Sequence, residues 1–377
     1  MSRIVRFSLN VSLILTLIFI PALTVYAQEP ETPQVRITQV DNSNFPNVTV
    51  YISATNAAGE PVGIDPSTIQ IHEDGQLMQL TDVRGGGEAL GGEAIPITTM
   101  LVIDISGSMD KGNKIGAAKD AAKTYISGMR AVDQAGVIAF DTQVYRIQEV
   151  TSDKSALTAA IDGLRTGSDT AMYEGIMEAT KALEGISGRK AILVLSDGLD
   201  NQSVATEESI VSNVGPSGLT VSAIGFGDPS GTGQAGIDEA GLQSLTSRTG
   251  GQYAYVTDAA TLTALYQQTG KAYQSEYAVT YVSPFTLRDG VNRNLSVALT
   301  GAPTVAEGTY NPGGVLPEVT ASSLPLFLSI LAGLLALLFL PGLIGGIANL
   351  AGGRKQGSGF GLGKQQAKPA SGRIKLK

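Results

Sequence analysis

Between residues 96 and 275 the chain alternates strand-like and helix-like segments, and this alternation restricts the fold more than any other feature. The strand-like segments are short apolar runs, typical of strands buried on both faces of a sheet. They cover residues 98–103, 135–140, 191–195, 219–225 and 252–256. Helical patterns cover residues 115–129, 155–164, 170–183, 207–214, 239–247 and 259–273. The region therefore belongs to the α/β class and is expected to form a doubly wound, mostly parallel sheet flanked by helices.

A second pattern surrounds this region. Residues 34–84 alternate apolar and polar side chains with a period of two, and clusters of turn residues separate the runs, which predicts a small antiparallel β domain. Two more strand-like runs, 277–282 and 295–299, follow the α/β region. We expect them to return to the first β domain, so that the α/β domain is inserted into a small β-sandwich.

Two apolar segments lie near the ends of the chain. Residues 11–27 follow Arg3 and Arg6 and end in small residues, which predicts a cleaved signal peptide; an uncleaved anchor is the alternative. Residues 324–350 hold no charged side chain and predict one C-terminal transmembrane helix. Seven basic and no acidic residues follow it, which by the positive-inside rule places the short tail in the cytoplasm and the N-terminal ectodomain outside. The expected location is the cell membrane, with a single pass.

These features divide the chain into eight parts. They are a signal peptide (1–27), a first part of the β-sandwich (28–84), a Gly-rich linker (85–95), the α/β domain (96–275), returning β-strands (276–300), a stalk (301–321), a transmembrane helix (322–350) and a basic cytoplasmic tail (351–377).

Composition excludes several function classes. Residues 28–321 hold 34 acidic and 17 basic side chains, and a body of this charge repels nucleic acid. The chain has no cysteine and one histidine, His72, so thiolate metal sites, cysteine nucleophiles and most histidine-based hydrolase chemistry are excluded. We therefore predict a binding protein and not an enzyme. An enzyme that uses a metal-activated water is the least favoured alternative.

Oxygen-bearing side chains follow the first strand of the α/β region. Asp104, Ser106 and Ser108 stand at alternate positions directly after residues 98–103, where a loop can turn all three towards one point. Thr170 opens a later helical segment, and Asp197 ends the buried strand 191–195. Carboxyl ends of parallel strands meet at one edge of a sheet, where ligands bind. Hard oxygen ligands without His or Cys favour Mg²⁺, or alternatively Mn²⁺ or Ca²⁺.

This three-part pattern resembles the von Willebrand factor type A (VWA) domain, a Rossmann-like fold, with its metal-ion-dependent adhesion site (MIDAS). The resemblance covers residues 96–275 and suggests a membrane-anchored prokaryotic protein of this type. It implies that Ser106, Ser108 and Thr170 contact the cation through hydroxyl oxygens, while Asp104 and Asp197 act directly or through water. The family's usual Gly-Gly-Thr is Ser168-Asp169-Thr170 here, which adds a carboxylate near the site. Residues 71–75 also resemble immunoglobulin-like segments of bacterial surface proteins.

The donor types suggest how such a site functions. If neutral hydroxyls make most direct contacts, the cation keeps positive character and an open coordination position, which an Asp or Glu of a partner protein can fill. The sequence therefore predicts a cell-surface or envelope protein that binds a protein ligand through a divalent cation. The alternative is a membrane scaffold subunit of an envelope complex that docks constitutively through its VWA domain. The expected partners are this protein ligand and the membrane lipid around one transmembrane helix, and no nucleic acid is expected.

Overall fold

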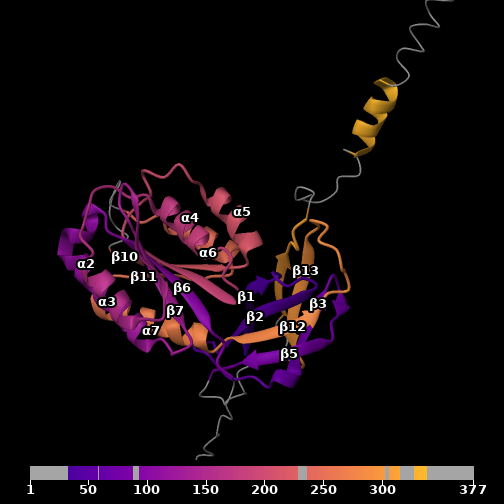
Figure 1. Ribbon diagram of the computed structural model, residues 1–377, viewed down its shortest axis with the longest axis horizontal. Helices are drawn as coiled ribbons and strands as arrows, with labels where there is room; N and C mark the ends of the chain where they lie inside the picture. Colours follow the sequence, from indigo (N-terminus) through magenta and orange to yellow (C-terminus); the bar gives the residue numbers. More distant parts are fainter. Residues whose placement is uncertain are drawn as a thin grey trace, which may run out of the picture. The chain divides into compact units, whose positions relative to one another are not determined.

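The computed structural model describes residues 33–57, 59–87, 93–227, 236–301, 305–314 and 327–337. The α/β domain is built on a six-stranded sheet in the order β11-β10-β9-β6-β7-β8 (Figure 1). Its strands are β6 (Ile97–Asp104), β7 (Gln134–Phe140), β8 (Val144–Thr151), β9 (Arg189–Ser196), β10 (Thr220–Phe226) and β11 (Tyr253–Val256). All neighbours pair in parallel except β7 and β8, so the sheet is mixed.

Helices cover both faces of this sheet, as the alternation of apolar segments predicts (Figure 1). One face packs against α2 (Lys114–Gly128), α3 (Lys154–Asp162) and α7 (Ala259–Gln274). The other packs against α4 (Met172–Ala182), α5 (Glu207–Ser217) and α6 (Glu239–Arg248). Every residue of β6, β9 and β10 is buried between the two layers, which explains their apolar sequences. A 3₁₀ segment, η3 (Gly107–Asn113), joins β6 to α2.

The second domain consists of two four-stranded sheets whose apolar residues share one core. The first sheet is β1 (Gln34–Asp41), β2 (Asn47–Thr55), β12 (Tyr277–Val282) and β5 (Leu80–Gly85). The second is β14 (Val305–Tyr310), β13 (Arg293–Leu299), β3 (Ile69–Glu73) and β4 (Gln76–Leu77), and η1 (Pro66–Thr68) precedes β3. Strands from before and after the α/β domain therefore pair with each other: β12 lies between β2 and β5, and β13 pairs with β3.

Two expectations need correction. Strand β8 was not predicted; it is an antiparallel edge strand in which no residue is buried, and its apolar pattern is weak. The predicted stalk 301–321 contains β14, which pairs with β13 and so belongs to the sandwich. Both strands lie at the edge of a sheet, where one side lacks a neighbour and the sequence signal for burial is small.

Several predictions fall outside the described residues. They are the signal peptide 1–27, residues 88–92 of the Gly-rich linker and the tail 351–377. Of the predicted transmembrane segment 322–350, residues 327–337 are described and form a helix. Among the described residues, no helix has both the length and the apolar character needed to cross a membrane.

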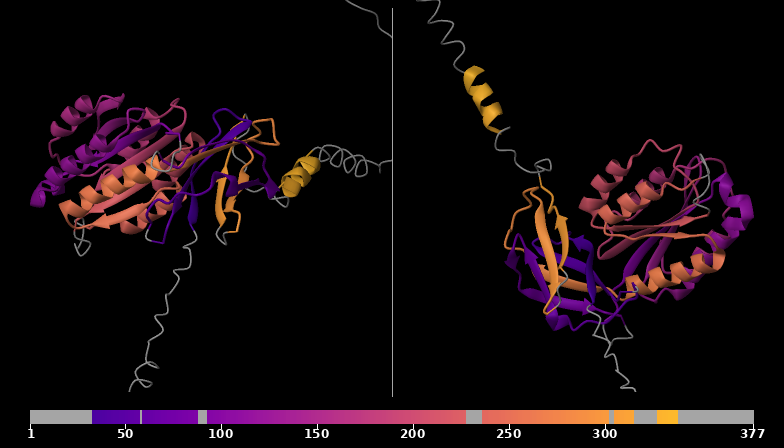
Figure 2. Two further views of the ribbon diagram at one scale, coloured as in Figure 1. Left: turned by 90° about the horizontal axis from the view of Figure 1, so that it is seen from below. Right: turned by 180° about the vertical axis from the view of Figure 1, so that it is seen from behind.

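A buried ion pair joins the sandwich to the base of the α/β sheet. Arg189, at the start of β9, donates two hydrogen bonds to the carboxylate of Glu276, of 2.5 Å and 2.9 Å. Glu276 lies between α7 and β12, at the point where the chain leaves the α/β domain for the sandwich. Figure 2 shows these two elements in orange, one in each domain. The side chains of Arg189 and Glu276 are 1% and 3% exposed. The connection between the two domains therefore includes a buried ion pair.

Candidate metal centre

The predicted site lies where the sheet changes its winding direction. Strands β6 and β9 are neighbours in register, with Ile103 opposite Leu195. After β6 the chain enters α2 on one face of the sheet, and after β9 it enters α5 on the other. The two loops therefore diverge at the carboxyl edge of the sheet, which is the usual position of ligand sites in such sheets. Asp104 ends β6 and Asp197 directly follows β9.

Asp104 is fully buried at the end of β6. Its Oδ1 accepts a hydrogen bond from the Ser106 backbone N–H at 2.7 Å, and its Oδ2 accepts one from the Ser196 hydroxyl, also at 2.7 Å. Burial raises the pKa of Asp104 to about 6, and the nearby Asp197 acts in the same direction, against the hydrogen bonds from Ser106 and Ser196. A carboxylate in this position is costly without a cation.

A chain of hydroxyl groups connects the two acidic positions. Ser106 Oγ lies 3.0 Å from Ser108 Oγ, and the Ser108 hydroxyl donates to Asp197 Oδ1 at 2.6 Å. Ser106 is 1% exposed, and the side chain of Asp197 is 0% exposed. Four of the five predicted residues are thus brought together by hydrogen bonds.

Thr170 reaches the same place from the loop before α4. Its backbone N–H donates to Asn201 Oδ1 at 3.0 Å, and a Cβ added to Gly198 would lie 3.8 Å from Thr170 Oγ1, so the hydroxyl lies beside the turn that carries Asp197. Within the described parts of the chain, no hydrogen bond holds this hydroxyl. Of the three predicted hydroxyl ligands, the hydroxyl of Thr170 is therefore the one whose oxygen is most available to a cation.

Backbone contacts fix the Thr170 loop against the serine loop. The Gly107 N–H donates to the Ser168 carbonyl at 2.7 Å, and the Gly167 N–H donates to the Ile105 carbonyl at 2.6 Å. A Cβ at Gly167 would lie 1.8 Å from Asp141 Oδ2, so a larger residue there would require the Asp141 side chain to shift. The hydroxyls therefore converge because two loops, about 60 residues apart in sequence, are bonded through their main chains.

Sequence reasoning missed three contributors to the site. They are Ser196, which donates to Asp104; Asn201, which orients Thr170; and Lys114, whose Nζ lies 2.5 Å from Asp197 Oδ2. Ser196 and Asn201 lie within four residues of Asp197 in the sequence, and this closeness to a predicted metal ligand could have identified them. Lys114 is 83 residues from Asp197, and no sequence pattern connects the two.

Three other acidic residues near the motif have different positions. Asp110 is exposed on η3, and among the described residues it makes no hydrogen bond. Asp169 is exposed and accepts a hydrogen bond from Gln202 at 3.3 Å. Asp200 accepts hydrogen bonds from the N–H groups of Tyr173 and Ser203, both at 2.9 Å, and so organises the loop after β9.

The donor set fits a hard divalent cation. It offers two buried carboxylates and three hydroxyls from three separate loops, all of them oxygen donors of the kind Mg²⁺ and Mn²⁺ accept. Among the described residues, no group of three or more His, Cys, Asp or Glu side chains is placed to hold a metal. An ion at this position would consequently depend on the hydroxyls of Ser106, Ser108 and Thr170. The positive character of such an ion is less neutralised than in a cage of carboxylates.

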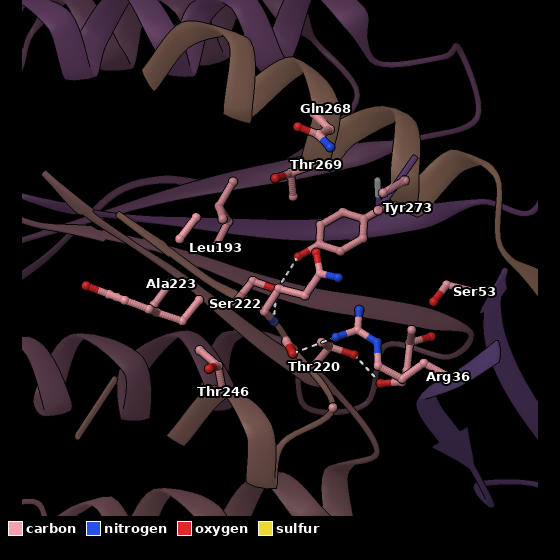
Figure 3. Close-up of a pocket in the computed structure, with 18 of the residues that line it drawn as sticks. Arg36, Ser53, Leu193, Thr220, Ser222, Ala223, Thr246, Gln268, Thr269 and Tyr273 are labelled. Carbon is pink, nitrogen blue, oxygen red and sulfur yellow. Dashed lines mark hydrogen bonds between the residues drawn. The ribbon is translucent and has the colours of Figure 1, made fainter. Parts of the chain in front are cut away.

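A separate cavity of about 510 Å³ lies between the sandwich and the α/β domain, near the amino end of β10 (Figure 3). Several of its polar groups bond to one another: Tyr273 donates to Ser222 at 3.0 Å, Arg36 donates to the Gly251 carbonyl at 2.9 Å, and Thr220 donates to the Thr38 carbonyl. These three bonds connect β1 and α7 to β10 and to the loop before β11, so the cavity lies at the junction between the two domains.

Comparison with known proteins supports the fold of the α/β domain. Residues 99–199 match the family model of the von Willebrand factor type A domain. Among curated proteins, the chain is 26% identical over 205 residues to a UPF0353 protein of Nocardia farcinica, covering 45% of this chain and 61% of that protein. It is 27% identical over 178 residues to a UPF0353 protein of Mycolicibacterium paratuberculosis, covering 41% and 53%. The chain thus spans between half and two thirds of the length of these two relatives.

Two solved structures are also similar. A von Willebrand factor type A protein from Catenulispora acidiphila has a TM-score of 0.44 and 14% identity, covering 75% of this chain and 74% of that one. Proximal thread matrix protein 1 from the mussel byssus, in a structure titled with a zinc-occupied MIDAS motif, has a TM-score of 0.43 and 18% identity, covering 50% and 48%. The family match identifies the α/β domain: the chain contains a VWA domain, with a mixed sheet flanked by helices.

Proposed function

We propose that this protein binds a partner protein through a divalent cation, Mg²⁺ in the first place, held by Ser106, Ser108 and Thr170 with Asp104 and Asp197 behind them. The observation that carries the proposal is the convergence of three hydroxyls and two buried carboxylates at the switch point of the sheet. VWA domains commonly bind a divalent metal at this position and typically mediate protein–protein interactions. The partner would contribute an Asp or Glu carboxylate.

The proposal requires the bound cation to keep at least one exchangeable water. This is tested with Mn²⁺, which strongly relaxes the protons of water that exchanges on and off the ion. We expect Mn²⁺ bound to the full-length chain to enhance water proton relaxation, and acetate, as a minimal carboxylate, to reduce the enhancement by displacing bound water. Chloride at equal ionic strength is the control. Bound Mn²⁺ that gives no enhancement, or an enhancement that acetate leaves unchanged, would mean a closed structural site.

We further propose that the protein is exported and held at the cell membrane, with the VWA domain outside and the tail inside. The support is the apolar segment 324–350, the basic residues after it and the apolar residues 11–27. Protease added to intact cells should then remove the VWA domain. A VWA domain that remains intact until the cells are lysed would reject the proposed orientation.

A further inference from the structure

The structure places a cation of the protein itself on one of the two acidic residues. Lys114 is the first residue of α2, and its Nζ lies 2.5 Å from Asp197 Oδ2. The other oxygen of Asp197 accepts the Ser108 hydroxyl at 2.6 Å. The side chain of Asp197 is 0% exposed and that of Lys114 is 23% exposed. Both oxygens of the buried carboxylate are therefore engaged by groups of the protein itself.

The ammonium changes the charge of the site in both of its states. Without a metal, Asp104 and Asp197 in their ionised forms and Lys114 sum to one negative charge. A divalent cation converts this to one positive charge, whereas a site without the lysine would be neutral after metal binding. Lys114 therefore repels the metal, and it adds attraction for an anion once the metal is bound.

We propose that Lys114 sets the cation affinity of the site by competing with the divalent ion for Asp197, and that it strengthens the capture of a partner's carboxylate once the ion is bound. The inference rests on the proposed metal-dependent function and deepens it. It gives one residue two opposite effects: weaker binding of the metal and tighter binding of the acid. A role confined to stabilising the fold would produce neither.

The surroundings of Lys114 allow this exchange. A cavity of about 690 Å³ adjoins it, lined by residues of η3 and α2 and by the chain after β10 and β11, among them Lys111, Gly227 and Asp258. A Cβ at Gly227 would lie 3.3 Å from Lys114 Nζ, so a side chain at this position would crowd the ammonium group. The lysine can thus withdraw from Asp197 into adjoining space while its charge stays near the site.

Lys114→Met tests the proposal, with Lys111→Met as the matched control. Both variants remove one positive charge from the same segment, but Lys111 is exposed and, among the described residues, it makes no ion pair with Asp197. Mn²⁺ binding to the full-length chain is followed by the electron paramagnetic resonance of the free ion. Acetate binding to the Mn²⁺-loaded protein is followed by water proton relaxation. We expect Lys114→Met to bind Mn²⁺ about tenfold more tightly and acetate several-fold more weakly, and Lys111→Met to change each by less than about twofold.

The possible results distinguish a failure of the inference about Lys114 from a failure of the proposed metal-dependent function. Equal Mn²⁺ affinity in the wild type and Lys114→Met, or weaker binding in the variant, overturns the inference and leaves the metal-dependent function standing. No binding in either protein rejects both. Binding in Lys114→Met alone supports competition by Lys114 and rejects metal-dependent function in the natural chain, favouring constitutive docking. Thermal unfolding verifies that the variant folds; Lys114→Gln, which keeps a hydrogen-bond donor, replaces it if it does not.

Discussion

Replacing Arg189 by Met should lower the free energy of unfolding by about 3–5 kcal/mol, because it leaves the buried carboxylate of Glu276 without its cation. The guanidinium makes further hydrogen bonds through Nη1, to Gln39 Oε1 at 3.0 Å and to Thr220 Oγ1 at 2.8 Å. It also lies 5.2 Å from the centre of the Tyr273 ring. The variant therefore removes one charge and the hydrogen bonds that the guanidinium donates to β1, to β10 and to the link between α7 and β12. Denaturant unfolding measures the change.

A double variant distinguishes loss of the pair from loss of packing. Glu276→Met alone should be similarly destabilising, whereas Arg189→Met with Glu276→Met should recover much of the loss, because no unpaired charge then remains buried. Arg84→Met is the matched control: Arg84 lies 2.7 Å from Asp82, but the two side chains are 50% and 46% exposed, so we expect a change below about 1 kcal/mol. Additive losses in the double variant would show that the two residues act independently.

Asp104→Asn should have opposite effects on the metal-free and the metal-bound protein. Without metal, the buried carboxylate is ionised at pH 7.5 although its pKa is raised from 3.8 to about 6. Two pKa units correspond to about 3 kcal/mol, and we expect the amide to recover about 1–2 kcal/mol of this as increased stability. With metal at 100 times its Kd, the wild type should gain about 2.7 kcal/mol that the variant lacks.

The pH dependence gives an independent check of the same residue. A carboxyl group whose pKa is raised by folding is protonated more readily in the native state, so the native state loses stability as pH rises through its pKa. The stability of the metal-free wild type relative to Asp104→Asn should therefore fall between about pH 4 and pH 6 and then remain constant. An advantage of the variant that is constant across this range would show that Asp104 is not the source.

The fold could be predicted where burial on two faces produces an unambiguous pattern. Strands β6 and β9 are buried at every residue and appear in the sequence as continuous apolar runs. Helix α2 has its buried residues on one face and shows the helical period, so both patterns are visible in the sequence. Strands β8 and β14 have mixed burial and no such period. The connection between domains depends on Arg189 and Glu276, 87 residues apart, and local sequence does not encode a contact of that separation.

Some residues of the candidate site could likewise be predicted from the sequence, and others could not. Asp104, Ser106 and Ser108 stand at alternate positions where strand β6 ends, so their common direction could be predicted, and Asp197 directly follows the neighbouring strand β9. Lys114 could not be found, because its ammonium reaches Asp197 only after α2 has packed beside the loop that follows β9. The contact of this ammonium with Asp197 is thus a product of tertiary packing.

The most direct test of the metal centre is the number of Mn²⁺ ions bound per full-length chain at equilibrium, measured from the resonance of the free ion. The account predicts one ion per chain in the wild type, displaced by Mg²⁺, and none in Asp104→Asn at the same concentrations. Thermal unfolding of both proteins without metal would establish that each is folded. A folded wild type that binds no Mn²⁺, or an Asp104→Asn variant that binds it as well as the wild type does, would contradict the assignment of Asp104, Ser106, Ser108, Thr170 and Asp197 as a cation site.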